Sequence, residues 1–228
     1  MCESYKTCYF CGGRATSDEH VPPKSLFPKD KSIIKEKFLI KVHSCKKHNE
    51  NFSKDDEYFA FVHASKRGND DNLENPIQDK ILRALKRKPH LIDTFFRNKS
   101  NALIRNNKTG LFLYTWKFEI DYLRIKNIII KISKAIINYE FGIIVTSDPL
   151  IIDYDIINRL NLVNIKEVIE TAIFCSSYPN IYKYFISYEG NEIYLIICFY
   201  DSSYYVISYE YHHLIAPETN ISWELFDA

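Results

Sequence analysis

The feature that most constrains this chain is a pair of short motifs near its N-terminus that offer metal ligands. Cys8 and Cys11 are separated by two residues, and Cys45 and His48 repeat that spacing. Structural zinc takes four tetrahedral ligands, and two tight turns that each supply two of them are a common arrangement. The spacing therefore predicts that residues 8–48 fold around one structural Zn²⁺ held by all four side chains.

Two alternatives to this ligand set stay open from the residues alone. Cysteines can fall at this spacing by coincidence, with His48 on the surface. His43 competes with His48 as the fourth ligand, but it points the same way as Cys45 only if its strand continues regularly. We therefore favour His48. Gly12 and Gly13 support the first turn, because glycine adopts positive φ without strain.

An acidic residue and a histidine lie between the two ligand pairs, in the run DEHVPP at residues 18–23. The two prolines exclude a helix here, so that His20 lies at the end of an extended segment. Adjacent side chains of an extended chain point to opposite sides. The near-neutral pKa typical of histidine suits His20 to a general base. Glu19 suits the binding of a hard cation such as Mg²⁺ or Mn²⁺.

Taken in order, these motifs resemble the HNH endonuclease family over residues 8–60. The resemblance rests on the first cysteine pair, on Glu19-His20, and on the second ligand pair followed by Asn49. The stretches 19–27 and 53–59 look like those of a bacterial subgroup of the family. The resemblance implies a ββα-metal fold of two strands and a helix, often stapled by zinc. It also implies hydrolysis of phosphodiesters with His20 as general base and with Glu19 and Asn49 as ligands of a catalytic Mg²⁺ or Mn²⁺.

The chain departs from the family pattern at three points. Glu19 replaces the usual aspartate, and the fourth zinc ligand is a histidine where cysteine is commoner. The asparagine expected on the strand before Cys45 has no obvious counterpart near Leu39 or Ile40. Further acidic and basic residues lie close by, and we interpret each of them singly as part of a solvated surface: Asp18, Lys54, Asp55, Asp56 and Glu57.

Charge is balanced overall but unevenly distributed. The chain holds 30 Lys and Arg against 29 Asp and Glu, yet residues 76–108 carry a net charge of +7 and residues 140–210 a net charge of −7. The basic stretch is either a contact surface for phosphate backbones or an ordinary solvated helix face. The acidic half either faces a protein partner or screens the basic surface. The candidate nucleic-acid-binding residues are Lys24, Lys54, Lys80, Arg83, Lys86, Arg87 and Lys88.

Hydrophobic periodicity predicts an α+β fold with a zinc-stapled domain at 1–68 and a mixed helical domain at 69–228. In the first domain we expect a strand at 38–44 and a helix from about 45 to 65. In the second we expect basic helices within 76–98, a strand at 111–119, a long apolar helix at 121–140 capped by Asp121, and one or two helices in 153–175. The chain should end in an antiparallel meander at 181–188, 192–199 and 203–210.

Location and function follow as expectations. The sequence has no apolar run long enough to span a membrane and no apolar signal-peptide core, so we expect a cytoplasmic protein. The leading hypothesis is an endonuclease that cuts DNA, with RNA as a possible substrate. A role in bacterial defence or in mobile elements is suggested only by the roles that members of the resembled family commonly have. The alternatives are a non-catalytic zinc module that binds nucleic acid or a protein partner, and a structural subunit.

Overall fold

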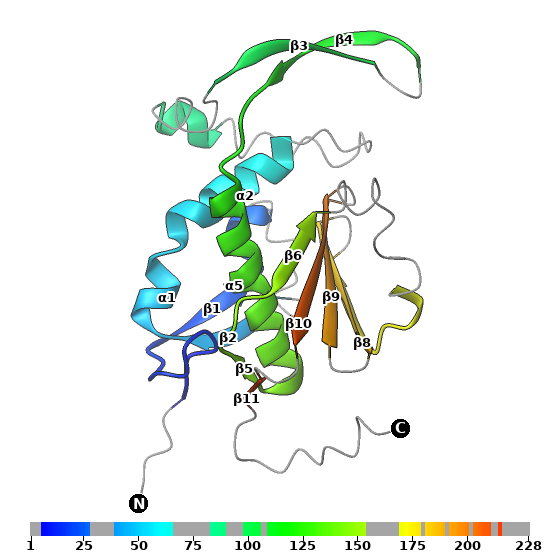
Figure 1. The fold of residues 1–228 in the computed structure, drawn as a ribbon. Coiled ribbons are helices and arrows are strands. Elements are labelled where there is room, and N and C mark those ends of the chain that lie inside the picture. The colour runs from blue at the N-terminus through cyan, green and yellow to red at the C-terminus, as the bar shows by residue number, and fades with distance from the viewer. Residues whose placement is uncertain are drawn as a thin grey trace, which may run out of the picture.

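The computed structural model describes residues 6–27, 39–65, 83–89, 98–105, 109–153, 169–178, 181–189, 192–200, 203–210 and 214–215. These residues form an α+β fold, as the periodicity predicted. A five-stranded antiparallel sheet lies on one side, a layer of two strands and two helices lies on the other, and one long helix runs between them (Figure 1). None of the described helices combines the length and the apolar character needed to cross a bilayer.

The N-terminal layer consists of β1 (Ser17–Val21) and β2 (Ile40–Ser44), the 3-10 turn η1 (Lys24–Leu26), and the helices α1 (Lys46–Glu50) and α2 (Ser53–Ser65). The two strands are antiparallel, with Glu19 opposite Val42. The predicted strand at 38–44 is confirmed over residues 40–44, and residue 38 lies outside the described residues. The single helix predicted from about 45 to 65 is two helices, because the chain breaks at residues 51–52 and directs the ring of Phe52 toward Phe10, at a centroid distance of 5.9 Å.

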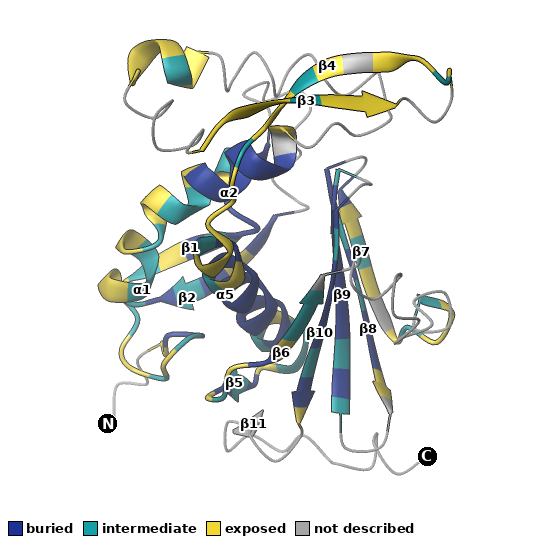
Figure 2. Cartoon of the chain, turned by 45° about the horizontal axis from the view of Figure 1, so that its top comes forward, coloured by how far each residue is buried: buried dark blue, intermediate teal, exposed yellow. Residues whose placement is uncertain are grey.

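Helix α5 (Tyr122–Phe141) forms the centre of the molecule and matches the predicted helix at 121–140. The Asp121 side chain accepts a hydrogen bond from the backbone N–H of Arg124, which caps the first turn. Gly142 ends the helix in the left-handed conformation, with φ of 69°. Its isoleucines are buried on both sides, against the N-terminal layer and against the sheet (Figure 2).

The sheet has the strand order β6-β10-β9-β8-β7, with all neighbours antiparallel. The predicted meander is confirmed as β8 (Tyr182–Glu189), β9 (Glu192–Phe199) and β10 (Ser203–Glu210). The outer strands β6 (Leu150–Asp153) and β7 (Phe174–Tyr178) were not predicted. The helical prediction for 153–175 is wrong at its C-terminal end, which enters β7, and most of that stretch lies outside the described residues.

One hydrophobic core joins the N-terminal layer, α5 and the sheet. The cluster includes Tyr9 and Phe59 from the first predicted domain, Ile129 from α5, and Leu195 and Ile207 from the sheet. Alternate residues of β8, β9 and β10 enter this core, as expected for a sheet with one face against a helix. The proposed domain boundary at 68 stays a prediction, since residues 66–82 are not described.

Two smaller strand pairs complete the fold. β3 (Ser100–Arg105) and β4 (Phe112–Lys117) form an antiparallel hairpin that rises away from the body, while β5 (Ile144–Val145) pairs with β11 (Leu214–Ile215). β4 was predicted as a strand and β3 was not. Of the basic helices predicted within 76–98, the structure describes helix only at 83–87, and the remaining part up to 97 lies outside the described residues apart from 88–89.

Candidate metal centre and adjoining pocket

The ligand atoms of Cys8, Cys11, Cys45 and His48 all lie within 4.8 Å of one another. The Nδ1 atom of His48 is 3.2 Å from the Sγ atom of Cys45 and 3.7 Å from that of Cys8. Bonds of about 2.0–2.3 Å to a tetrahedral zinc place ligand atoms roughly 3.3–3.8 Å apart. These four residues, which we call the Cys/His cluster, can therefore hold a metal ion such as zinc.

Two tight turns present the ligands. In the first, the backbone N–H of Cys8 donates to the carbonyl of Gly13 at 2.7 Å and that of Gly12 donates to the carbonyl of Cys8 at 2.8 Å, with Gly12 at φ of 72°. In the second, Cys45 precedes α1 and its carbonyl accepts from the backbone N–H of His48 at 3.1 Å. The positive φ at Gly12 fits the predicted role of a glycine in this turn.

The surroundings favour the ligand forms that a metal needs. Burial works to raise the pKa of the Cys8 thiol, but hydrogen bonds from the backbone of Cys45 and Phe10 outweigh burial and lower the pKa. Burial, together with the positive charges of Lys47 and Lys134, lowers the pKa of His48. A thiolate and a neutral imidazole are the metal-binding forms of these side chains. The ring of Phe10 stacks on His48 at a centroid distance of 4.5 Å and orients it.

His43, the competing ligand in the sequence, lies outside the cluster. Its Nδ1 atom is 2.6 Å from Oδ1 of Asp18, the residue opposite it across the two strands. That pair is largely exposed, and hydrogen bonding to His43 holds the pKa of Asp18 below its usual value. The choice of His48 over His43 is therefore the one that the geometry supports.

A pocket of about 280 Å³ opens beside the Cys/His cluster, and α1 contributes to both. Three residues that the sequence singled out for catalysis, Glu19, His20 and Asn49, are all in its wall. The complete wall consists of Asp18, Glu19, His20, Pro23, Lys24, Ser25, Asn49, Ser53, Asp56 and Glu57. The structure thus brings the predicted catalytic residues to one place, although they come from a strand and a helix about thirty residues apart.

Two residues of the pocket wall, Glu19 and Asp56, belong to a buried charge cluster that lies behind the wall. The Nζ atom of Lys131, on α5, lies 2.5 Å from Oε1 of Glu19 and 2.9 and 3.0 Å from the two carboxylate oxygens of Asp56. Lys131 is fully buried and Glu19 is 5% exposed. Tyr9 donates its hydroxyl to Oε2 of Glu19 at 3.1 Å. Both oxygens of the Glu19 carboxylate are therefore bound from the protein side.

The charge cluster shifts two pKa values. Burial raises the pKa of Asp56 to about 6, although the ammonium of Lys131 acts in the opposite direction. Burial, and then the negative charge of Glu19, holds the pKa of Tyr9 well above its usual range. Tyr9 therefore remains a hydrogen-bond donor to Glu19 at all ordinary pH values. Asp56 was interpreted from the sequence as a solvated residue, and that interpretation is wrong, because its carboxylate packs against Lys131.

The other two predicted catalytic residues face the pocket differently. His20 is half-buried on β1, next to Glu19, whose side chain enters the core as strand alternation requires. The amide nitrogen of Asn49 donates to Oγ of Ser17 at 2.8 Å, which ties α1 to the start of β1. The amide oxygen of Asn49 is the atom left to act as a ligand.

The predicted nucleic-acid-binding residues fall into three places. Lys24 is in the pocket wall and Lys54 is exposed on the first turn of α2. Lys88 lies 3.5 Å from Glu57, which is also in the wall, so the basic stretch is adjacent to the pocket. Arg83, Lys86 and Arg87 are exposed on the described helical turn, and Lys80 lies outside the described residues.

The motifs did not reveal Lys131 and Tyr9, which bind Glu19 from behind the pocket wall. A signal for Lys131 was present, because a lysine in the middle of an apolar helix must find a carboxylate partner. Lys134 gives the same signal: it is 3% exposed, lies over the ring of Phe10 and is 3.4 Å from Asp148. The identity of the partners required the fold.

Comparisons with known proteins add nothing to this geometry. No protein-family model, no curated protein and no solved structure matches the chain.

Proposed function

We propose that this protein is a metal-dependent endonuclease of the HNH type, with its catalytic domain in residues 8–60. The observation that best supports the proposal is that Glu19, His20 and Asn49 line one pocket beside the Cys/His cluster. These are the residues to which the family resemblance assigns catalysis. The order of two antiparallel strands followed by a helix is also the order that the resemblance implies.

The Cys/His cluster would carry a structural zinc in this proposal. It joins the turn before β1 to the start of α1, and Asn49 follows its fourth ligand directly. The hydrogen bond from Asn49 to Ser17 reinforces the same junction. Structural zinc contributes folding free energy outright. Its role here is to hold helix and strand together so that the pocket keeps its shape.

The donor atoms in the pocket suit Mg²⁺ or Mn²⁺. Such cations take oxygen ligands, and Glu19 and Asn49 supply a carboxylate and an amide oxygen. An ionised carboxylate has about four acceptor positions, of which Lys131 and Tyr9 use two in Glu19. When bound, the cation would neutralise charge on the phosphate and on the leaving oxygen.

The chain's own residues would perform the remaining steps. His20, half-buried at the pocket wall, accepts a proton from the water that attacks phosphorus. Lys131 balances the buried carboxylates of Glu19 and Asp56 and fixes their positions. Lys24 in the wall and Lys88 beside Glu57 offer positive charge to the phosphates on either side of the scissile bond.

One observation favours a second candidate, a zinc module that binds nucleic acid without cutting it. The ammonium of Lys131 already neutralises Glu19 from inside the protein. A cation that binds Glu19 from the pocket must do so next to this positive charge, and like charges repel strongly at low dielectric. A protein that only binds nucleic acid needs no cation at Glu19, so the Lys131–Glu19 pair would not impair its function.

Cleavage assays separate the two candidates. Zinc-loaded protein is incubated with supercoiled plasmid, single-stranded DNA and RNA, with Mg²⁺ or Mn²⁺. The proposal predicts nicking that requires the added cation and falls by about 100-fold or more in Asn49→Ala and Glu19→Gln. Glu57→Gln changes an exposed carboxylate in the same wall and should retain activity. Absence of cleavage on all three substrates, or full activity in Asn49→Ala, contradicts the nuclease proposal.

A further inference from the structure

The hairpin β3–β4 exposes apolar side chains in a way that the rest of the described chain does not. Phe112, Tyr114 and Trp116 follow one another on alternate positions of β4, and Tyr114 is 88% exposed. Figure 2 shows the hairpin almost entirely as exposed surface, above a body whose strands are mostly buried or intermediate. Most other described aromatic residues fill the core, and the further exposed rings, Tyr122, Tyr139 and Tyr188, do not form a row along one strand. Three exposed rings in a row therefore need a binding partner to explain them.

The register puts the three rings on one face. Asn101 pairs with Trp116, Leu103 with Tyr114, and Arg105 with Phe112, and directly opposed residues of an antiparallel pair share a face. The ammonium of Lys99 lies 3.6 Å from the centre of the Trp116 ring, on the same face. We call this surface the ribbon face; it consists of Lys99, Asn101, Leu103, Arg105, Phe112, Tyr114 and Trp116.

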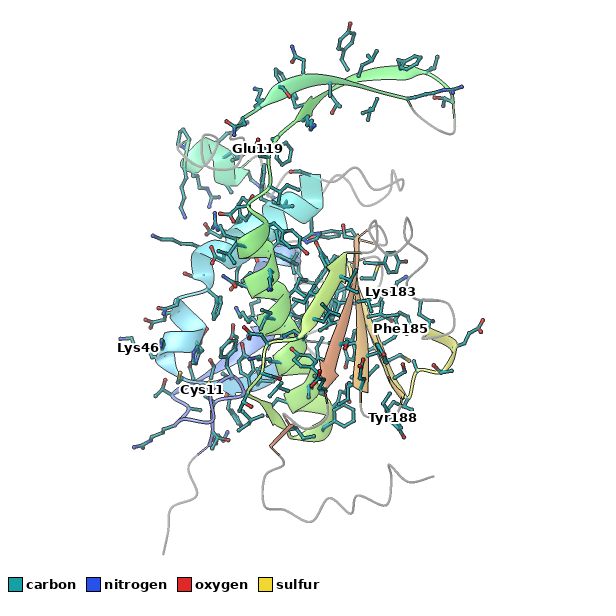
Figure 3. The ribbon with its side chains drawn as sticks, in the orientation of Figure 1. Cys11, Lys46, Glu119, Lys183, Phe185 and Tyr188 are labelled. Carbon is teal, nitrogen blue, oxygen red and sulfur yellow. The ribbon has the colours of Figure 1, made fainter. Side chains whose placement is uncertain are left out.

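All charged residues of the hairpin are positively charged. Residues 94–118 contain Arg97, Lys99, Arg105, Lys108 and Lys117 and no Asp or Glu. Among the described residues, the nearest acidic side chain in the sequence is Glu119, at the foot of the hairpin (Figure 3), and it accepts a hydrogen bond from Asn98. The ribbon face is thus aromatic and cationic, which complements a partner that offers both flat rings and negative charge.

The foot of the hairpin is fixed to the layer that carries the pocket. Phe118 packs against Phe61 of α2, and the backbone N–H of Asp121 donates to the hydroxyl of Tyr58 at 2.8 Å. Arg124 forms an ion pair with Asp55 at 2.5 Å. The hairpin is therefore held at the end of α2, while the first turn of the same helix borders the pocket.

We propose that the ribbon face binds single-stranded nucleic acid, with bases stacked on Phe112, Tyr114 and Trp116. The Lys99 ammonium, which lies over the Trp116 ring, would move from it to a phosphate, and Arg105 would bind another phosphate. Alternate residues of a strand are about 6.8 Å apart. That is roughly twice the 3.4 Å rise per nucleotide of a stacked strand. A single strand can stretch to this spacing and place one base on each ring, which is the stacking platform used by many single-strand binders.

The geometry argues against two rival partners. In a duplex the base faces are covered by their neighbours, so the three rings have nothing to stack on. A second copy of this chain would bring two positively charged hairpins together, and like charges oppose that contact. Single-stranded DNA and RNA should both bind, because stacking and phosphate contacts do not involve the 2′-hydroxyl that distinguishes the two.

The test is fluorescence anisotropy with labelled dT20, rU20 and a 20-base-pair duplex, at low salt and without Mg²⁺ or Mn²⁺. The full-length protein should bind both single strands more tightly than the duplex. The double variant Tyr114→Ala/Trp116→Ala should weaken single-strand binding by at least about 30-fold, since each lost stack is worth roughly five-fold or more. Tyr114→Phe, which keeps the ring, should stay within about two-fold of the wild type.

Two further readouts localise the contact. Trp223→Phe leaves Trp116 as the sole tryptophan, and its fluorescence should be quenched by dT20 and not by the duplex. Arg105→Gln should reduce the slope of log affinity against log salt by about 0.7, the value for one phosphate contact on a single strand. Tyr139→Ala removes a similarly exposed ring from α5 and serves as the control with unchanged affinity.

Affinity unchanged in Tyr114→Ala/Trp116→Ala overturns the inference. Equal binding of duplex and single strand does so as well. If the same variant instead abolishes concentration-dependent self-association in sedimentation, the face is a contact between copies of the chain. The inference does not rest on cleavage: a protein that binds dT20 through this face and cuts nothing supports it while contradicting the nuclease proposal.

Discussion

The Cys/His cluster and the pocket beside it share helix α1, yet they are built in opposite ways. The cluster takes its ligands from two local turns and lies near the surface, with Cys11 exposed. The wall residues Glu19 and Asp56 are paired with Lys131, which lies 75 residues after Asp56 and is fully buried. Local spacing marks the two turns of the first site, which the pairing of β1 with β2 brings together, whereas the second site needs α5 packed in place. The two should therefore respond differently to mutation and to pH.

Loss of the cluster should have the largest effect. Cys45→Ser is expected to abolish zinc binding and to cost several kcal/mol of stability in the N-terminal layer, because zinc binding and folding are coupled. Metal analysis of the purified protein should give one zinc per wild-type chain and close to none in the variant. Cys175→Ser removes an exposed cysteine outside the cluster and is the control. A full complement of zinc in Cys45→Ser contradicts the assignment of the ligands.

Removal of the buried positive charge of Lys131 should have the second-largest effect on stability. Lys131→Met leaves Glu19 and Asp56 buried without a positive partner, and breaking a buried ion pair costs about 3–5 kcal/mol. Urea unfolding measures the loss. Lys126→Met changes an exposed lysine on the same helix and should stay within about 0.5 kcal/mol of the wild type. Equal effects of the two substitutions would show that the charge cluster does not stabilise the fold.

The charge cluster behind the pocket should also make the stability of the fold depend on pH. Burial raises the pKa of Asp56 from 3.8 to about 6, so the folded protein binds a proton more readily there than the unfolded chain. The resulting stability is fully present below pH 4 and is lost as the pH rises through 6. The shift corresponds to about 2–3 kcal/mol.

Unfolding measured from pH 4 to pH 8 should therefore show a component that Asp56→Asn removes. Glu57→Gln alters an exposed carboxylate on the same helix and should leave that component in place. A pH profile that is identical in Asp56→Asn and the wild type contradicts the burial argument.

The smallest effect on stability is expected at the rim of the pocket. Lys88 and Glu57 are 3.5 Å apart and about half exposed, so Lys88→Gln should change stability by no more than about 0.5 kcal/mol. The same variant should weaken binding to a DNA duplex and reduce the salt slope by about 0.9. Lys46→Gln changes an exposed lysine at the start of α1, outside the pocket wall, and is a control for general loss of charge (Figure 3).

The contrast between the sites also explains what could be predicted from the sequence. Cys8, Cys11, Cys45 and His48 were identifiable because metal ligands on tight turns leave a spacing signature. α5 and the meander were identifiable because Asp121, Gly142 and strand alternation are local signals. These predictions depended on neighbours along the chain, and the structure agrees with them.

Other features depended on long-range contacts. The partners of Lys131 come from β1 and α2, and no periodicity reports such a meeting. Strand β3 begins with the polar residues Ser100 and Asn101, and both of its faces are largely exposed. It therefore lacks the alternation of apolar and polar residues that predicts a strand. Strand β7 follows a stretch without clear periodicity, and it is recognisable only through its pairing with β8. The break between α1 and α2 serves the packing of Phe52, which the helix pattern could not indicate.

In the proposed nuclease His20 activates water in the pocket, so a comparison of His20→Ala with His43→Ala should separate the two histidines. The two histidines lie on neighbouring strands, but only His20 is in the pocket wall. Initial rates of plasmid nicking are measured with zinc-loaded proteins and Mn²⁺. We expect a loss of about 100-fold or more in His20→Ala, with unchanged zinc content, and near wild-type rates in His43→Ala. Equal rates in the two variants would contradict it.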